Sequence, residues 1–248
     1  MEIIRVRDLT VGYGETAILR DLRFDIPRGR ITVIVGESGS GKSTLLKTLI
    51  GLLPPLSGSV LLSGRQVDYR SEEHLRQLYG RIGVLYQNSA LLNSMSLYDN
   101  IALPIRIHRS DRGRRDEAER VAAMLGRVGL QGSEEKFPYE LSGGMRKRAA
   151  LARAMVLEPE IVFCDEPSSG LDPITAAGLD ELLVELCRAH EMTFVVVTHE
   201  LRSIERIAHH LLLLREGAIR FDGGLKDLEG SGDPYVRAFF LRTAKHDH

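Results

Sequence analysis

The chain contains Gly36-Glu37-Ser38-Gly39-Ser40-Gly41-Lys42-Ser43-Thr44, which fits the pattern G-x-x-x-x-G-K-[ST] of phosphate-binding loops. An apolar, β-branched run from Ile31 to Val35 precedes the loop and predicts a buried strand. A helical pattern from Leu45 to Ile50 follows the loop. A strand, a glycine-rich loop and a helix in this order are the context in which such a loop binds the phosphates of a nucleotide.

The residue types of this loop suit a polyphosphate. Glycines let backbone N–H groups turn toward an anion, and the N-terminus of the following helix adds the positive end of its dipole. Lys42 can reach the β- and γ-phosphates, and the Ser43 hydroxyl is a hard oxygen ligand that suits Mg²⁺. We therefore predict that residues 36–44 bind a nucleoside triphosphate with Mg²⁺.

The composition is that of a soluble globular protein, with 248 residues, 43% hydrophobic residues and 27% charged residues. The net charge of −1 gives no basic field, so nucleic acid is not an expected partner. Cys164 and Cys187 are the two cysteines, which favours a reducing, cytoplasmic setting. Apolar runs such as Leu211 to Leu214 are far too short to span a bilayer, so we expect membrane contact only through a partner.

Periodicity along the chain predicts an α/β fold. Weak alternation over residues 3–26, with turn signals between the runs, predicts antiparallel strands. Apolar strands at 161–164 and 193–197 alternate with helical patterns, which is typical of a mostly parallel sheet with helices on both faces. Ser71 is expected to cap a helix over 72–79, and Asp172 is expected to cap a second helix with Pro173 in its first turn. Residues 96–107 are interpreted as a mixed segment broken by Pro104.

Polar residues follow several of these strands, at the edge where ligands bind in such folds. Asp165 can hold Mg²⁺, and Glu166 can polarise a water molecule that attacks a γ-phosphate. For His199 a structural and a functional role remain equally open from the residues alone. Gln87 ends a predicted strand and is weak evidence for a metal or water contact.

Two further features concern nucleotide binding. Ser142, Gly143 and Gly144 precede a helical pattern, and N–H groups at a helix start beside a serine hydroxyl make a second anion site. Two phosphate-binding surfaces on one chain indicate that a second molecule completes each site. Tyr13 lies in a predicted turn, where an aromatic that covers the sheet edge is favoured over one that stacks on a base.

In these motifs the sequence resembles the ATP-binding cassette (ABC) ATPases over essentially its whole length. The family's motifs occur in the family's order: Tyr13 as the aromatic on adenine, residues 36–44 as Walker A, Gln87 as the Q-loop glutamine, 141–145 as the signature, 161–166 as Walker B, 169–172 as the D-loop and His199 as the switch histidine. The resemblance thus reverses the interpretation of Tyr13.

The resemblance implies a single ABC ATPase domain over 1–248. It consists of a P-loop NTPase core with a mostly parallel sheet, an N-terminal antiparallel β lobe and a helical lobe inserted at roughly 88–157. Two copies would pair head to tail, with ATP between residues 36–44 of one copy and Ser142, Gly143 and Gly144 of the other.

The resemblance also implies roles for single residues. Lys42, Gln87, Glu166 and His199 would be catalytic, with Glu166 activating water and His199 sensing the γ-phosphate. Ser43, Gln87 and Asp165 would be the metal ligands. A groove beside Gln87 would receive a helix of an integral membrane permease, which dimer closure on ATP would drive between two states.

A more specific resemblance lies in Leu141-Ser142-Gly143-Gly144-Met145-Arg146-Lys147-Arg148, where Met145 replaces the family's usual glutamine. This stretch is similar to the ATPases of Mla-type phospholipid transporters, which work with permeases and MCE-type lipid-binding proteins. It implies an ATP-hydrolysing subunit, peripheral on the cytoplasmic face of the inner membrane, whose transporter moves phospholipid or another hydrophobic compound.

Two alternatives stay open. One is the ATPase of a small-solute transporter, for example of an amino acid, because other subunits handle the cargo. The other is a soluble ABC switch protein without a transport role, which the single cassette, the absence of a heptad run and the absence of a basic patch disfavour.

Overall fold

The main sheet of the protein has six strands in the order β10-β9-β3-β8-β7-β6. We analysed a computed structural model that describes residues 1–108, 113–228 and 230–243. Neighbouring strands from β9 to β6 are parallel, and only β10 pairs antiparallel, with β9. The prediction of a mostly parallel sheet is therefore confirmed. The strands are β3 (Ile31–Gly36), β6 (Ile82–Leu85), β7 (Ile161–Asp165), β8 (Thr193–Val197), β9 (His210–Arg215) and β10 (Ala218–Gly223).

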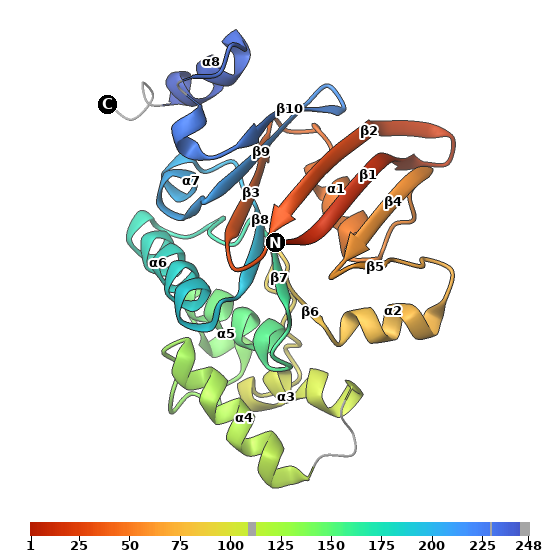
Figure 1. Cartoon of the computed structure of the whole chain (residues 1–248). Helices are drawn as coiled ribbons and strands as arrows, with labels where there is room; N and C mark the ends of the chain where they lie inside the picture. Colours follow the sequence, from red (N-terminus) through yellow and green to blue (C-terminus); the bar gives the residue numbers. More distant parts are fainter. Residues whose placement is uncertain (109–112, 229, 244–248) are drawn as a thin grey trace.

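A second, antiparallel sheet lies beside the main sheet and has the order β2-β1-β4-β5 (Figure 1). Val6 in β1 pairs with Phe24 in β2 on one side and with Val60 in β4 on the other. The antiparallel strands predicted for residues 3–26 are thus confirmed. The strands are β1 (Glu2–Tyr13), β2 (Thr16–Pro27), β4 (Ser57–Leu62) and β5 (Arg65–Gln66).

Helices cover the sheets and form a separate lobe. Between β6 and β7 the described chain is helical, and α3, α4 and α5 lie together below the main sheet in Figure 1. Helix α8 lies at the opposite end of the molecule. The helices are α1 (Lys42–Leu49), α2 (Glu72–Tyr79), α3 (Leu97–His108), α4 (Arg114–Arg127), α5 (Gly143–Met155), α6 (Pro173–His190), α7 (Leu201–Ile207) and α8 (Pro234–Thr243), with 3₁₀ turns η1 (Pro138–Glu140) and η2 (Leu225–Asp227).

Both faces of the main sheet are buried, which explains its nearly continuous apolar strands. Successive side chains of a strand point to opposite faces. Val33 and Val35 of β3 pack into the cluster formed with α3 to α7, whereas Ile34 packs into the cluster formed with α1 and the antiparallel sheet. In β7, Phe163 likewise belongs to the second cluster and Cys164 to the first. The strands therefore hold two cores apart and tie both to one sheet.

The segment around Pro104 corrects a prediction. The chain does not break there, because α3 is one continuous helix from Leu97 to His108 with the proline inside it. A proline removes one hydrogen bond and crowds the preceding turn, at a cost of about 3 kcal/mol. Burial of Leu97, Ile101 and Ile105 in the core cluster with α5 outweighs this cost. The prediction overestimated the effect of Pro104 on the helix, because the sequence pattern did not show how completely this helix face is buried.

Two predicted helix starts are confirmed by their caps. The Ser71 hydroxyl accepts a hydrogen bond from the backbone N–H of His74 at 3.2 Å, and α2 begins at the next residue. Asp172 accepts hydrogen bonds from the N–H groups of Ile174 and Thr175, with Pro173 in the first turn of α6. Both follow the preference of short polar residues for the position before a helix.

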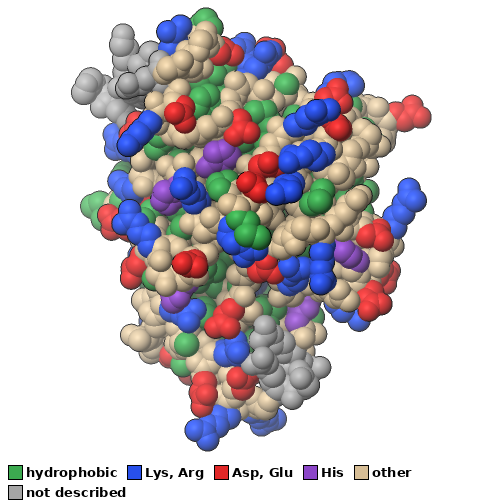
Figure 2. Space-filling view, viewed as in Figure 1, with side chains coloured by type: hydrophobic (Ala, Val, Ile, Leu, Met, Phe, Trp, Pro, Cys, Tyr) green, Lys and Arg blue, Asp and Glu red, His purple; other side chains and the backbone are tan. Residues whose placement is uncertain are grey.

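The face of the molecule seen in Figure 2 carries acidic and basic side chains interspersed, rather than a field of one sign. Some form ion pairs across strands, such as Arg7 with Asp25 at 2.7 Å. Within the described ranges, no helix combines the length and the apolar character needed to cross a membrane.

Replacing Phe163 tests the role of the sheet as the support of both cores. Its side chain is fully buried, so Phe163→Ala should lower the free energy of unfolding by about 3–5 kcal/mol. Chemical denaturation measures this loss. Arg115→Ala is the control, because that side chain is 94% exposed and its removal should change stability by less than about 0.5 kcal/mol. Equal effects of the two substitutions would contradict this view of the core.

Candidate functional site

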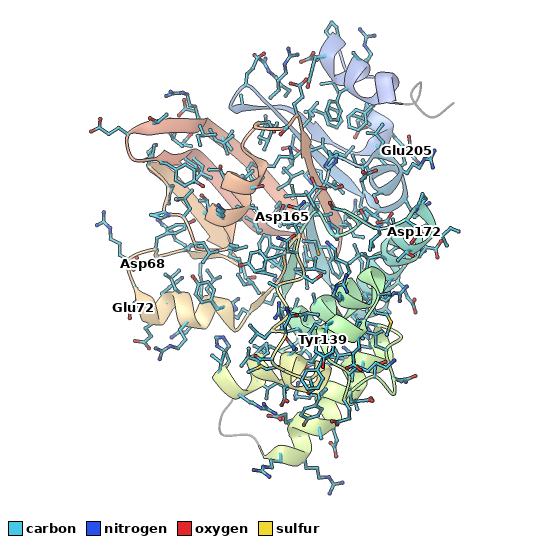
Figure 3. The ribbon with its side chains drawn as sticks, turned by 180° about the vertical axis from the view of Figure 1, so that it is seen from behind. Asp68, Glu72, Tyr139, Asp165, Asp172 and Glu205 are labelled. Atoms are coloured by element: carbon cyan, nitrogen blue, oxygen red, sulfur yellow. The ribbon has the colours of Figure 1, made fainter. Side chains whose placement is uncertain are left out.

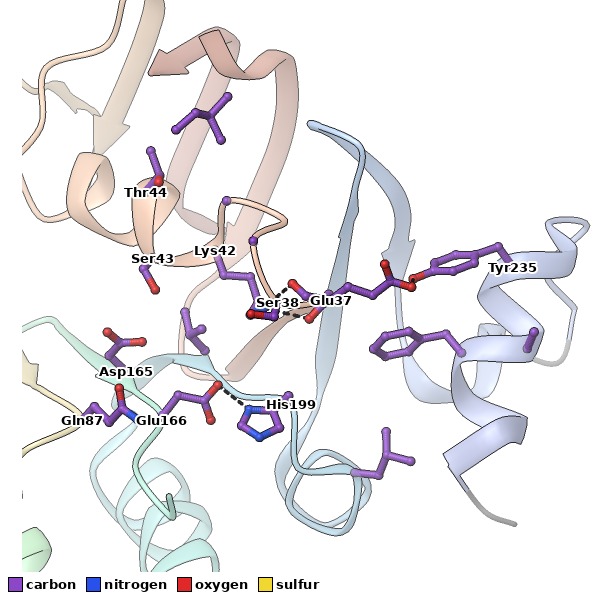
Figure 4. Close-up of a pocket in the computed structure, with 18 residues that line it drawn as sticks. Glu37, Ser38, Lys42, Ser43, Thr44, Gln87, Asp165, Glu166, His199 and Tyr235 are labelled. Carbon is purple, nitrogen blue, oxygen red and sulfur yellow. Dashed lines mark hydrogen bonds and ion pairs between the residues drawn. The ribbon is translucent and has the colours of Figure 1, made fainter. Parts of the chain in front are cut away.

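Loops that follow four strands of the main sheet meet in one pocket of about 1140 Å³ (Figure 4). Because β3, β6, β7 and β8 are parallel, their carboxyl ends lie at the same edge. Figure 3 shows Asp165 at this edge, above the helical lobe that carries Tyr139. The predicted site residues that line the pocket are Gly36, Glu37, Ser38, Gly39, Gly41, Lys42, Ser43, Thr44, Gln87, Asp165, Glu166 and His199.

The loop between β3 and α1 depends on glycine. Gly41 has a φ of 98°, and a Cβ there would lie 2.7 Å from a methyl carbon of Leu19. A Cβ on Gly36 would lie 2.4 Å from the carbonyl oxygen of Leu214. The Ser40 hydroxyl is buried and has no hydrogen-bond partner among the described residues. An unsatisfied buried donor in a loop of this shape is the chemistry that a phosphate oxygen would satisfy.

Lys42 is held over the loop by the loop itself. Its ammonium donates to the carbonyl oxygens of Gly36 at 2.8 Å and Glu37 at 2.9 Å. Burial lowers the pKa of Lys42, while Glu166 and Asp165 act in the opposite direction. The charge therefore faces the carboxylates across the pocket, where a polyphosphate would pair with it.

Ser43, Gln87 and Asp165 point into the same part of the pocket in Figure 4. Burial raises the pKa of Asp165, and the neighbouring Glu166 raises it further, whereas Lys47 and Lys42 lower it. A cation beside Asp165 would offset both the burial and the repulsion. The described residues contain no cluster of three or more His, Cys, Asp or Glu side chains that could hold a metal ion alone. Ser43, Gln87 and Asp165 offer hydroxyl, amide and carboxylate oxygens, and such oxygens fit Mg²⁺, which typically binds one or two carboxylates plus substrate phosphates.

Glu166 and His199 form a pair at the edge of the pocket. The Glu166 carboxylate accepts a hydrogen bond from Nδ1 of His199 at 2.7 Å. Its other oxygen, Oε2, is buried. The backbone of Glu166 has a φ of 48°, and its N–H donates to the carbonyl oxygen of Val197 in β8. This geometry leaves Oε2 of Glu166 without a hydrogen-bond partner among the described residues.

The structure does not bring every predicted site residue to this pocket. Ser142, Gly143 and Gly144 start α5 outside its lining, and the Ser142 hydroxyl accepts from the N–H of Met145 at 3.3 Å. Tyr13 ends β1, is 50% exposed and also lies outside the lining. Ser40 belongs to the loop but does not line the pocket, and its hydroxyl is buried.

The family described as "ABC transporter" matches residues 19–169 of this chain. That span holds the glycine-rich loop, Gln87, Asp165 and Glu166, and it covers more than half of the sequence. The chain belongs to the ABC transporter family. It is an ABC ATPase, which is the ATP-binding and ATP-hydrolysing subunit of a transporter.

Curated relatives of this ABC ATPase match along nearly the whole chain. A Mycobacterium leprae protein named "Probable ribonucleotide transport ATP-binding protein mkl" is 43% identical over 95% of this chain and 68% of its own length. The Escherichia coli (strain K12) protein named "Intermembrane phospholipid transport system ATP-binding protein MlaF" is 38% identical over 96% of this chain and 88% of its own length. The predicted resemblance to ABC ATPases is therefore confirmed.

Solved structures confirm the ABC ATPase fold. CbiO1 from Clostridium perfringens, part of the ABC transporter complex cbiONQ, superposes with a TM-score of 0.86 at 29% identity, covering 99% of this chain and 97% of that one. The cassette MJ0796, solved as a dimer, superposes with a TM-score of 0.81 at 28% identity, covering 90% of this chain and 98% of that one.

Helix α8 contributes to the pocket of the ABC ATPase in a way that the sequence did not reveal. Tyr235, Ala238 and Phe239 line the pocket opposite the glycine-rich loop. The Tyr235 hydroxyl donates to Glu37 at 2.8 Å, and its ring lies 3.6 Å from the guanidinium carbon of Arg215. The aromatic residues of α8 can be read from the sequence, but no local pattern indicates that Tyr235 contacts Glu37 and Arg215.

Lys147 is a second residue near the site that the sequence reasoning missed. Its side chain is buried on α5 and donates to the backbone oxygens of Gln87 at 2.5 Å and Glu166 at 3.2 Å. The available signal was its spacing, because Lys147 shares one face of the helix with the buried residues Ala150 and Leu151. A lysine in the apolar register of a helix requires a polar partner in the interior.

The contact between Tyr235 and Glu37 can be tested by one hydroxyl. Tyr235→Phe removes the hydrogen bond but keeps the ring on Arg215, so it should lower the free energy of unfolding by about 0.5–1 kcal/mol. Chemical denaturation without nucleotide measures the effect. Tyr139→Phe is the matched control, because Tyr139 is 72% exposed and should give no change. A loss of the same size in the control would refute the contact.

Proposed function

We propose that this ABC ATPase powers a transporter of phospholipid or another hydrophobic compound from the cytoplasmic face of the inner membrane. The observation that carries the cargo is the stretch 141–148 around Met145, which is similar to that of Mla-type ATPases. The 38% identity to MlaF, over 88% of that protein, supports the same conclusion. The relative named for ribonucleotide transport makes a polar cargo the alternative.

In the proposed reaction, residues 36–44 bind the phosphates of ATP. Backbone N–H groups of the loop and the N-terminus of α1 supply the donors, and Lys42 exchanges its two loop carbonyls for phosphate oxygens. Glu166 orients a water molecule through its carboxylate and receives its proton. His199 holds one carboxylate oxygen of Glu166 through Nδ1 and is proposed to sense the γ-phosphate. Positioning and charge neutralisation carry the catalysis.

Mg²⁺ is the proposed cofactor, and Ser43, Gln87 and Asp165 are its proposed ligands. When bound, it neutralises charge on the β- and γ-phosphates. Asp165 contributes the negative charge, and burial, followed by the neighbouring Glu166, raises its pKa, which a bound cation would offset. Gln87 lies on the loop after β6 and donates to Ser169 at 3.5 Å, at the limit of a hydrogen bond, so its amide is free to reorient.

A second copy is the proposed partner at the nucleotide. Ser142, Gly143 and Gly144 lie at the start of α5 but outside the pocket of their own chain. A head-to-tail pair would place them over ATP bound to residues 36–44 of the other copy. The dimeric structure of MJ0796, and its form bound to ADP and phosphate, support this arrangement. Tyr13, half-exposed at the end of β1, is proposed as the platform for adenine.

A groove of about 260 Å³ beside Gln87 is the proposed docking site of the permease. It lies between β6 and the helical lobe, which we propose to delimit as an insertion of roughly 88–157 within one domain. Tyr86 and Ile107 line it and are 39% and 63% exposed, which is apolar surface suited to a helix. An MCE-type lipid-binding protein is the further partner proposed from the Mla resemblance.

Two substitutions test the proposed roles in hydrolysis. Lys42→Ala should abolish ATP binding, because the loop loses its cation. Glu166→Gln should retain ATP binding and lose hydrolysis by at least about 100-fold, because the amide cannot accept the proton of water. Phosphate release and nucleotide binding are measured on the full chain with Mg²⁺. Full hydrolysis in both variants would overturn the proposed site.

The groove is tested by a charge in its wall. Ile107→Asp should reduce co-purification of the permease and leave the unfolding of the isolated chain unchanged, because Ile107 is exposed. Leu52→Asp is the matched control, since Leu52 is 53% exposed and lies outside the groove. Equal recovery of the permease with both variants would argue against this docking site.

The cargo is tested by purifying the tagged chain from solubilised membranes of its native host. Mass spectrometry should find an integral permease, an MCE-type protein and bound phospholipid. A permease with a solute-binding protein would replace phospholipid by a small solute. Soluble partners without a permease would refute the transport role altogether.

A further inference from the structure

We propose that Lys147 is a positioning residue that holds Gln87 and Glu166 in the geometry required for hydrolysis. The proposal rests on the proposed roles of those two residues. Lys147 contacts neither the pocket nor any atom expected to react. It acts through the backbone behind the site.

Lys147 forms hydrogen bonds with two loops that lie far apart in the sequence. Its ammonium donates to the carbonyl oxygen of Gln87, after β6, and to that of Glu166, after β7. The side chain is only 5% exposed. Burying an ammonium is costly unless it is well hydrogen-bonded, so both carbonyls are held firmly against it.

The backbone on the other side of these hydrogen bonds is strained. Glu166 has a φ of 48°, and Ser89 and Ala90, just after Gln87, have φ values of 60° and 49°. Left-handed conformations of residues other than glycine persist only where the surroundings enforce them. A cation bound to the carbonyl of such a residue is one way to enforce the conformation.

A second cation of the same helix supports the same loop. Arg153, two turns after Lys147 on α5, donates to the carbonyl oxygens of Ala90 at 2.7 Å and Ser89 at 2.9 Å. Side chains of α5 thus hydrogen-bond to the segment from Gln87 to Ala90 at both of its ends. Lys147 differs from Arg153 because it alone also reaches Glu166.

The position of Lys147 on α5 adds a mechanical consequence. The helix starts at Gly143, directly after Ser142, and Lys147 lies about one turn further along. A movement of the helix start would therefore displace the ammonium that holds Gln87 and Glu166. In the proposed dimer, the start of α5 in one copy covers the nucleotide bound to the other copy. Through Lys147, the same helix contacts Gln87 and Glu166 of its own chain.

The test compares three variants of the full chain purified with its membrane partners. Lys147→Met keeps the length of the side chain and removes its donors, so kcat should fall about 10- to 100-fold while KM for ATP changes less than about 3-fold. Lys147→Arg keeps donors and charge and should recover part of the lost kcat. Lys136→Met is the control, because Lys136 is exposed on the helical lobe and the same substitution should leave kcat unchanged.

Amide hydrogen exchange gives an independent measurement. Peptides that cover residues 86–91 and 165–169 should exchange faster in Lys147→Met than in the wild type. In Lys136→Met their exchange rates should equal those of the wild type. Should Lys147→Met not fold, Lys147→Gln, which keeps a shorter donor, takes its place with the same expected direction for kcat and exchange.

The outcomes separate this proposal from the proposed function. Wild-type kcat in Lys147→Met, together with a dead Glu166→Gln, would overturn the positioning role and leave the site intact. Equal losses in kcat and in ATP binding would also overturn it, because they indicate a general structural defect. Full hydrolysis in Glu166→Gln would instead refute the proposed function of the site.

Discussion

Burial of both faces of the main sheet is the constraint on which the rest of the structure depends. Residues of β3 alternate between the two cores, so a slip by one position would move every side chain of the strand into the other core, where it does not match its neighbours. The ends of β3, β6, β7 and β8 are fixed as a result, and with them the loops that carry Lys42, Gln87, Glu166 and His199. The cores therefore determine where the loops of the pocket begin.

The positive and negative charges of the pocket come from different loops. Lys42 comes from the loop after β3, whereas Asp165 and Glu166 come from the end of β7. Burial and the neighbouring Glu166 raise the pKa of Asp165, so a cation beside it would be stabilised, while Lys42 on the opposite wall would pair with a polyphosphate.

Much of the fold and of the site could be predicted from the sequence because local patterns determine them. The glycine-rich loop, the apolar strands and the caps at Ser71 and Asp172 all depend on neighbours within a few residues. The continuous helix through Pro104 could not be predicted, since it depends on burial against α5. Tyr235 and Lys147 were missed for the same reason, because each meets its partner across a long stretch of chain. Tertiary packing decided these cases.

The aromatic wall of the pocket on α8 has a practical consequence. The sequence contains no tryptophan, so the protein lacks the usual intrinsic fluorophore. Phe239 lines the nucleotide pocket and packs edge-on against Phe240, with Tyr235 on its other side. A single indole introduced at that position would be the one tryptophan fluorophore of the sequence and would lie in the wall of the pocket. The chain thus offers a natural place for an optical sensor that follows occupancy of the pocket in real time without a labelled nucleotide.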